Sequence, residues 1–138
     1  MHPLRQAVES HDPAAIEALL ADDVVFTSPV AFKPYPGKAI TAAIIRGVMR
    51  VFEDFRYVRE IVDTNGRDAA LVFEATVAGK QLSGCDFVHL DDAGKIDSLT
   101  VMVRPLSAAT ALAEAMGAQF DRIQREATEQ LQAEAAGA

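Results

Sequence analysis

The chain has 138 residues, half of them apolar and 24% charged, and a net charge of −7. This length and composition fit one globular domain, residues 1–138, that buries a sizeable core. The acidic balance disfavours phosphate backbones and anionic lipid surfaces, so we expect neither nucleic acid nor a membrane as a partner.

The N-terminal third predicts two helices and then a strand. Apolar residues between Leu4 and Val8 share one helical face, and Asp12 before Pro13 is a strong start signal for a second helix. The Asp22-Asp23 pair predicts the end of that helix. The β-branched and aromatic run at 24–28 predicts the first strand.

The segment 28–37 carries three prolines, which predict an irregular loop. Phe32 and Tyr35 make this loop unusually apolar, and we expect them to fold back over the interior. From Lys38 to Phe52, apolar residues at steps of three and four predict a long helix.

The second half of the chain predicts a meander of four antiparallel strands and then a helix. Its links are short and rich in turn-forming residues, so consecutive strands pair antiparallel. The alanine-rich segment after Pro105 predicts a C-terminal helix, which divides the chain into a core (1–106), a helix (107–134) and a frayed tail (135–138). The predicted strands are 55–64, 69–78, 81–90 and 96–104.

Helices followed by a meander indicate an α+β fold. Cys85 is the only cysteine, and His2, His11 and His89 form no closely spaced ligand set, so we expect no disulfide and no metal or other cofactor. The first residues lack the apolar stretch of a secretory signal, and no run approaches the roughly 18 apolar residues of a membrane span. We therefore expect a cytoplasmic protein.

Two segments, LLADDVVFTSPVAFKPYPGKAI and CDFVHLDDAGKIDSLTVMVRP, resemble the SnoaL-like, nuclear-transport-factor-two-like superfamily over roughly residues 1–106. The resemblance implies a strongly curved antiparallel sheet, made of the meander and the N-terminal strand. Helices on its concave face would form a cone-shaped pocket. The superfamily contains ketosteroid isomerases, polyketide cyclases, epoxide hydrolases and dehydratases, and also non-catalytic binding or dimerisation modules, so the fold alone does not fix an activity.

The ketosteroid isomerases allow a comparison residue by residue. Their proton-shuttling Asp precedes a Pro-Val pair after the first strand, where this chain has Ser28, and a serine hydroxyl is not an efficient base near neutral pH without a partner base. Their oxyanion-binding Tyr falls near Leu4, where no tyrosine occurs. Their second oxyanion donor, a protonated Asp, matches Asp86. The two differences argue against that isomerase reaction, but they leave the predicted pocket in place.

Asp86 is the candidate catalytic residue, because aspartate is uncommon in strands and this one has apolar neighbours. If it faces the cavity, desolvation raises its pKa and lets it donate a hydrogen bond or carry a proton. The alternative is an Asp on a solvated sheet face, or one paired with Arg104. His89 has the opposite parity, so we do not expect it to assist Asp86.

Nine further residues are candidates for binding a substrate. Ser28, Tyr35 and Arg104 are the expected orienting groups, although a surface salt bridge is the alternative for Arg104. Tyr57 shares a strand face with Phe55 and Arg59, and we interpret it as a sheet aromatic with an exposed hydroxyl rather than as a phenol donor. The apolar candidates have the alternative of simply filling the core. The full set is Phe26, Ser28, Phe32, Tyr35, Phe52, Tyr57, Val88, Met102 and Arg104.

Two functions follow as hypotheses. The first is a pocket protein for a hydrophobic small molecule, acting as an acid–base isomerase, cyclase or hydratase on a carbonyl compound. The second is a non-catalytic ligand-binding or dimerisation module. We also expect a homodimer, because an uncovered apolar sheet face tends to pair, through either Phe87 or the opposite-parity Val101 and Val103.

Overall fold

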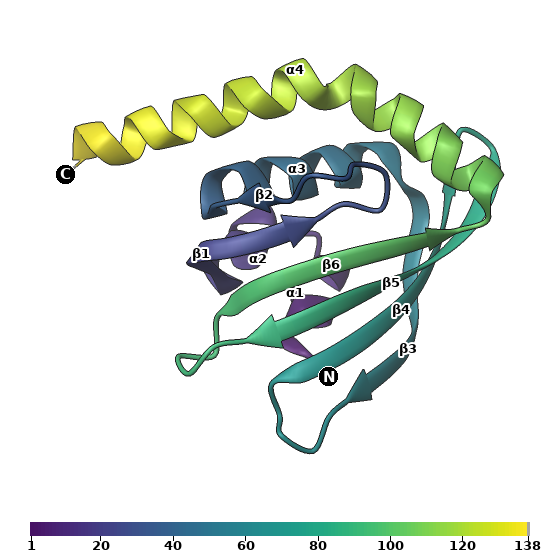
Figure 1. The fold of residues 1–138 in the computed structure, drawn as a ribbon, viewed down its shortest axis with the longest axis horizontal. Coiled ribbons are helices and arrows are strands. Elements are labelled where there is room, and N and C mark those ends of the chain that lie inside the picture. The colour runs from purple at the N-terminus through teal and green to yellow at the C-terminus, as the bar shows by residue number, and fades with distance from the viewer. Residues whose placement is uncertain (138) are drawn as a thin grey trace.

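A computed structural model describes residues 1–137, which form four helices and one six-stranded sheet (Figure 1). The N-terminal elements are α1 (Pro3–Glu9), α2 (Pro13–Leu19), β1 (Leu20–Thr27), β2 (Tyr35–Pro36) and α3 (Lys38–Val51). The C-terminal elements are β3 (Glu53–Val62), β4 (Asp68–Val77), β5 (Lys80–Leu90), β6 (Ile96–Arg104) and α4 (Leu106–Gly137).

The strands lie in the order β2-β1-β6-β5-β4-β3, and β3 to β6 form the antiparallel meander that the turn signals predict. The α+β class and the curved sheet are thereby confirmed. The sheet is mixed, however, and not purely antiparallel, because β1 pairs parallel to β6. Local turn signals set only the pairing of consecutive strands. They do not reach β1, which is separated from β6 by α3 and four strands.

The curved sheet wraps around α1, α2 and α3, and α4 crosses over α3 (Figure 1). Alternation along β4 places Ala69, Leu71 and Phe73 on the inner, helix-facing side, where each is buried. The core therefore lies between the concave side of the sheet and the helices, and the same space holds the cavity described below.

Three element boundaries differ from the sequence prediction. Asp22 and Asp23 lie within β1 and not at a helix end, since the strand exposes both and buries Val24 and Phe26. The proline-rich loop contains the short strand β2, in which Tyr35 pairs with Phe26. Positions 135–137 of the predicted frayed tail continue α4, and Ala138 lies outside the described residues.

The helix α4 is held on α3 by close packing and by ion pairs. Gly47 on α3 lets Ile123 approach so closely that a Cβ at position 47 would lie 2.7 Å from its Cδ1 atom. Beside this contact, Arg46 and Arg50 of α3 both pair with Glu126 of α4, at 3.2 and 3.5 Å. The middle of α4 is thereby fixed on α3.

The outer face of the sheet carries exposed apolar side chains, led by Phe87 and Met102. Val101 and Val103 instead belong to the inner side, where they pack against the core. The uncovered face is therefore the one that carries Phe87, and not the one that carries Val101 and Val103. The homodimer itself stays a prediction. Within residues 1–137, no helix combines the length and the apolar character that crossing a membrane requires.

Gly84 on β5 makes room for the aromatic wall of the interior. It is the register partner of Phe73 on β4, and a Cβ at position 84 would lie 2.2 Å from the Phe73 ring. Phe73 is almost fully buried and contacts the rings of Phe52, Phe55 and Tyr57, with centroids 4.9 to 6.3 Å apart. Any shift of the ring away from Gly84 would disturb these aromatic contacts.

We expect Gly84→Ala to destabilise the protein by about 1–3 kcal/mol, because the added methyl group overpacks the Phe73 ring. Urea unfolding followed by circular dichroism measures the change. Combining it with Phe73→Leu should cost less than the sum of the two single variants, since the shorter side chain vacates the contested space. Ser83→Ala, at the neighbouring outward position, is the control. Wild-type stability for Gly84→Ala would contradict this account.

Candidate functional site

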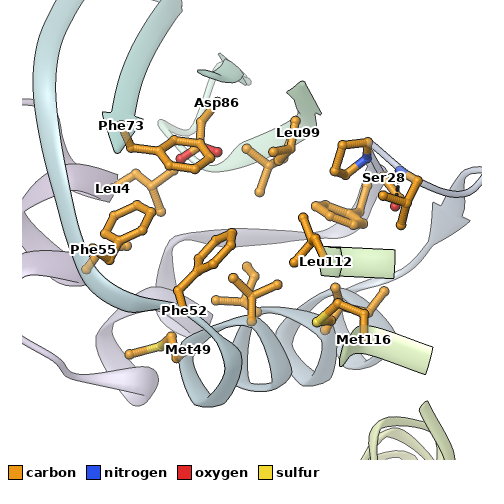
Figure 2. Close-up of a pocket in the computed structure, with 18 of the residues that line it drawn as sticks. Leu4, Ser28, Met49, Phe52, Phe55, Phe73, Asp86, Leu99, Leu112 and Met116 are labelled. Carbon is orange, nitrogen blue, oxygen red and sulfur yellow. Dashed lines mark hydrogen bonds between the residues drawn. The ribbon is translucent and has the colours of Figure 1, made fainter. Parts of the chain in front are cut away.

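A cavity of about 710 Å³ lies between the concave face of the sheet and the helices. Its walls are mainly apolar and aromatic side chains (Figure 2). The strands contribute Phe26, Phe55, Phe73, Leu99 and Val101; α3 contributes Ile44, Ile45, Val48 and Met49; α4 contributes Leu112, Met116 and Phe120. A volume of this size is in the range of small-molecule binding sites.

Asp86 and Tyr57 are a hydrogen-bonded pair in this apolar wall. The Tyr57 hydroxyl donates to the Oδ2 atom of Asp86 at 2.8 Å, and both residues line the cavity. Tyr57 lies on β3 and Asp86 on β5, so the phenol reaches across the intervening strand β4. Leu4, Phe73 and Leu99 lie around the carboxyl group (Figure 2).

Burial dominates the electrostatics of the pair. Removing the Asp86 carboxylate from water raises its pKa to about 7, and the hydrogen bond from Tyr57 opposes this shift because it stabilises the ionised form. Burial, and then the neighbouring Asp86 charge, raise the pKa of Tyr57 far above its ordinary value. Tyr57 therefore remains a donor, and Asp86 changes its charge near neutral pH.

The second carboxyl oxygen, Oδ1, has no hydrogen-bond partner within residues 1–137. A neutral carboxyl group with Oδ2 bound to Tyr57 would carry its proton on Oδ1, ready to donate. Above the pKa, the same oxygen is an acceptor. The pair can thus hold a carbonyl oxygen or exchange a proton with it, in surroundings where such bonds are stronger than in water.

The position of Tyr57 corrects our interpretation of it as a sheet aromatic with an exposed hydroxyl. The residue is buried, and the β3 register shifts between Tyr57 and Arg59. Tyr57 therefore pairs with the inward Phe73, whereas Arg59 pairs with the outward Val72. Simple alternation would have placed Tyr57 and Arg59 on one face.

Ser28 also lines the cavity, but its oxygen is already engaged. Its Oγ accepts from the backbone N–H groups of Val30 and Ala31 at 3.1 and 3.2 Å, closing the turn after β1. An oxygen that accepts two hydrogen bonds is a poor base, while its own O–H remains able to donate. Ser28 can therefore orient a polar ligand group.

Besides Tyr57, three of the predicted apolar and aromatic binding residues line the cavity, and Phe32, Val88 and Met102 do not. Phe26, Tyr35 and Phe52 are in the wall, where Tyr35 bridges the rings of Phe26 and Phe120 at 6.4 and 6.0 Å. Phe32 is instead 98% exposed, because pairing with β1 anchors the loop at Tyr35 and leaves position 32 outside. Val88 is buried in the core beyond the cavity.

Met102 and Arg104 lie on the outer face of β6, so the structure places neither of these predicted binding residues in the wall of this cavity. Val101 lines the cavity. Met102 and Arg104 are one and three residues further along β6, so strand alternation points them to the opposite face of the sheet. Nor does Arg104 approach Asp86: its register partner is Ser83, while that of Asp86 is Val101. His89 also lies outside, where its Nδ1 is 2.6 Å from Asp97.

Sequence reasoning missed two parts of the site. Charged side chains at Glu9, Asp54 and Arg56 line an exposed part of the cavity. The other part is the wall from α4, which the sequence marked only as an apolar helical stripe. In the described part of the chain, no group of three or more His, Cys, Asp or Glu side chains is placed to hold a metal ion.

Comparison with known proteins identifies the family of this fold and site. The SnoaL-like domain family matches residues 4–99, about seven tenths of the chain. The chain belongs to the SnoaL-like domain family. The predicted resemblance is thereby confirmed, and the match includes Tyr57 and Asp86 but ends before α4. No curated protein matches the sequence.

Two solved structures show how closely the SnoaL-like fold is shared. A steroid delta-isomerase from Pseudomonas aeruginosa is 38% identical, with a TM-score of 0.81, over 87% of this chain and 88% of that chain. An uncharacterised bacterial protein with a cystatin-like fold, from Silicibacter pomeroyi DSS-3, is 34% identical, with a TM-score of 0.83, over 91% and 93%. Both comparisons extend beyond the span of the family match.

The raised pKa of Asp86 predicts that stability falls as pH rises from about 4 to about 7. The folded state keeps the Asp86 proton in this window, whereas the unfolded state, with an ordinary pKa near 3.9, releases it. The stabilisation is complete below pH 4 and lost through pH 7, amounting to about 4 kcal/mol. Asp86→Asn should remove this component of the pH dependence, as measured by urea unfolding at a series of pH values. If Asp86→Asn keeps the wild-type dependence of the unfolding free energy on pH, the prediction is wrong.

Tyr57→Phe should raise the pKa of Asp86 further, because it removes the donor that stabilises the carboxylate. The side-chain carboxyl ¹³C shift of Asp86, followed over a pH titration, measures this value directly. Phe55→Leu, which alters the neighbouring ring but no hydrogen bond, is the control. An Asp86 pKa that is lower in Tyr57→Phe than in the wild type would contradict the idea that the Tyr57 hydrogen bond stabilises the carboxylate.

Proposed function

We propose that the protein binds a hydrophobic carbonyl compound in the cavity, and that Asp86 donates a hydrogen bond to its carbonyl oxygen and exchanges a proton with it. One observation carries the proposal. A buried carboxyl group lies in an apolar cavity, with one oxygen held by Tyr57 and the other without a partner in the described chain.

The proposed chemistry begins with neutral Asp86. Its Oδ1 proton donates to the ligand carbonyl and polarises it, which acidifies the carbon next to the carbonyl. As negative charge grows on the ligand oxygen, the proton moves toward that oxygen and Asp86 becomes a carboxylate. The Tyr57 hydroxyl stabilises this carboxylate. The α-proton leaves to a water molecule that enters through the exposed side of the cavity, and the hydronium ion that forms returns a proton to Asp86. The pair thereby supports enol formation, the step that isomerisation and cyclisation of carbonyl compounds share.

Two observations support a ligand with fused rings. The cavity volume suits a drug-sized molecule, and its wall is largely aromatic and aliphatic. The 38% identity to a protein described as a steroid delta-isomerase supports a steroid-sized ketone. Ser28 would orient such a ligand by donation and would not act as its base.

The second candidate function is non-catalytic binding. It is favoured by Ser28, which stands where the related isomerases carry their base and whose oxygen already accepts two backbone hydrogen bonds. In that case the Tyr57–Asp86 pair would fix the orientation of a ligand without transferring a proton.

A steroid ketone with ¹³C at its ring carbonyl tests the hydrogen bond. We expect the bound carbonyl signal to move downfield below pH 7 and to lose that shift above pH 7, as Asp86 ionises. Asp86→Leu should abolish the shift, whereas Asp86→Asn, which retains a neutral donor, should keep a shift that no longer depends on pH. Met102→Leu on the outer face is the matched control.

Exchange of the ketone's α-protons in D₂O separates catalysis from binding. We expect the wild-type protein to accelerate this exchange and Asp86→Asn to bind the ketone without accelerating it. If neither protein accelerates exchange but the carbonyl shift depends on Asp86, the non-catalytic function holds. A carbonyl shift that is the same in wild type and Asp86→Leu would overturn both roles for Asp86.

A further inference from the structure

His2 is buried at the start of α1, where its ring caps the helix. Only 6% of the residue is exposed. The backbone N–H of Leu4 donates to the Nδ1 atom of His2 at 3.1 Å, so His2 is the N-cap of α1. Asn, Asp, Ser and Thr are the preferred caps, and none of them titrates near neutral pH as histidine does. The choice of histidine makes this helix end sensitive to pH.

The cap requires the neutral form of the His2 ring. An imidazole whose Nδ1 accepts a hydrogen bond carries its only ring proton on Nε2. A second proton would go to Nδ1, so two N–H groups would face each other and the bond from Leu4 would be lost. Nε2 is itself buried and has no hydrogen-bond partner within residues 1–137. The buried position therefore suits a neutral ring and not a charged one.

The charged groups around His2 do not offset the burial of a charged ring. Glu60 of β3 faces His2, but both of its carboxylate oxygens accept from the His2 backbone N–H, at 3.0 and 3.1 Å, and Arg5 lies 3.9 Å from one of them. Burial lowers the pKa of His2, Glu60 opposes this shift, and the amino group of Met1 adds to it. An open first turn, with the ring in water, thus binds a proton more tightly than the closed turn does.

The turn that His2 caps also places Leu4 in the cavity wall. Leu4 is almost fully buried and lies beside the Asp86 carboxyl group (Figure 2). This contact helps to keep water from the carboxyl, and burial is what raises the pKa of Asp86. Glu60, which holds the His2 backbone, lies in the same row of the sheet as Asp86, since both are register partners of Leu71.

We propose that His2 is a positioning residue that acts as a pH-sensitive latch on the cavity wall. Its neutral ring closes the first turn of α1 and keeps Leu4 over the Asp86 carboxyl. Protonation of the ring opens this turn and admits water to Asp86. Neither step requires a ligand, so the latch operates whether the cavity catalyses a reaction or only binds.

Amide hydrogen exchange at Leu4 measures the latch, because this N–H is the donor to the His2 ring. The protection factor corrects for the intrinsic pH dependence of exchange. We expect it to fall by up to about tenfold per pH unit below about pH 6.5, the ordinary pKa of histidine, because the open turn binds one more proton there than the closed turn.

His2→Asn separates the latch from a purely structural cap. Asparagine keeps a side-chain acceptor for the first turn but cannot be protonated, so the Leu4 protection factor should stay constant from pH 7 to pH 5. His89→Asn is the matched control, because it makes the same substitution on the outer face of the sheet, where His89 lies beside Asp97. It should retain the wild-type pH dependence.

The carboxyl ¹³C titration of Asp86 tests the connection to the cavity. We expect a lower Asp86 pKa in His2→Ala than in the wild type, because an uncapped turn lets water reach the carboxyl, and a wild-type value in His2→Asn. Leu4→Ala should also lower this pKa, since it leaves the cap in place but removes the side chain that covers Asp86.

A Leu4 protection factor with the same pH dependence in the wild type and in His2→Asn would overturn the latch. An Asp86 pKa that His2→Ala leaves unchanged, while Leu4→Ala lowers it, would overturn the positioning role. If His2→Ala does not fold, the comparison of the wild type with His2→Asn decides the proposal, because asparagine restores the cap.

Discussion

The hydrogen bond from Tyr57 to Asp86 is the interaction around which the interior is organised. A carboxylate buried among apolar side chains is costly, and one donor at 2.8 Å offsets only part of that cost. The remainder is expressed as the raised pKa of Asp86. Because most of the surrounding wall is apolar, the unpartnered oxygen of Asp86 is well placed to anchor a polar group of a ligand.

The aromatic part of the cavity wall depends on a position that has no side chain. Gly84 lets the Phe73 ring lie against the sheet, and this ring packs beside Tyr57 and keeps it in place. Gly84 thereby helps to hold the polar pair in its place in the cavity wall.

The family relationship divides the site into two parts. The match to the SnoaL-like domain covers the sheet that carries Tyr57 and Asp86, and it ends before α4. The α4 wall, with Met116 and Gly117, is fixed to α3 by Ile123 and by ion pairs to Glu126. The polar pair thus lies within the matched span, while the α4 part of the cavity wall lies outside it.

The sequence by itself determined the five longer strands, the α+β class and the unusual Asp86, since alternation, turn residues and a rare strand aspartate are local signals. It did not determine which face of β6 is inner, because Val101 and Met102 are both apolar and only packing distinguishes them. It also could not place Tyr57, whose inward position requires a register shift and whose partner lies two strands away. These features depend on contacts between residues distant in the chain, and only the tertiary structure decides them.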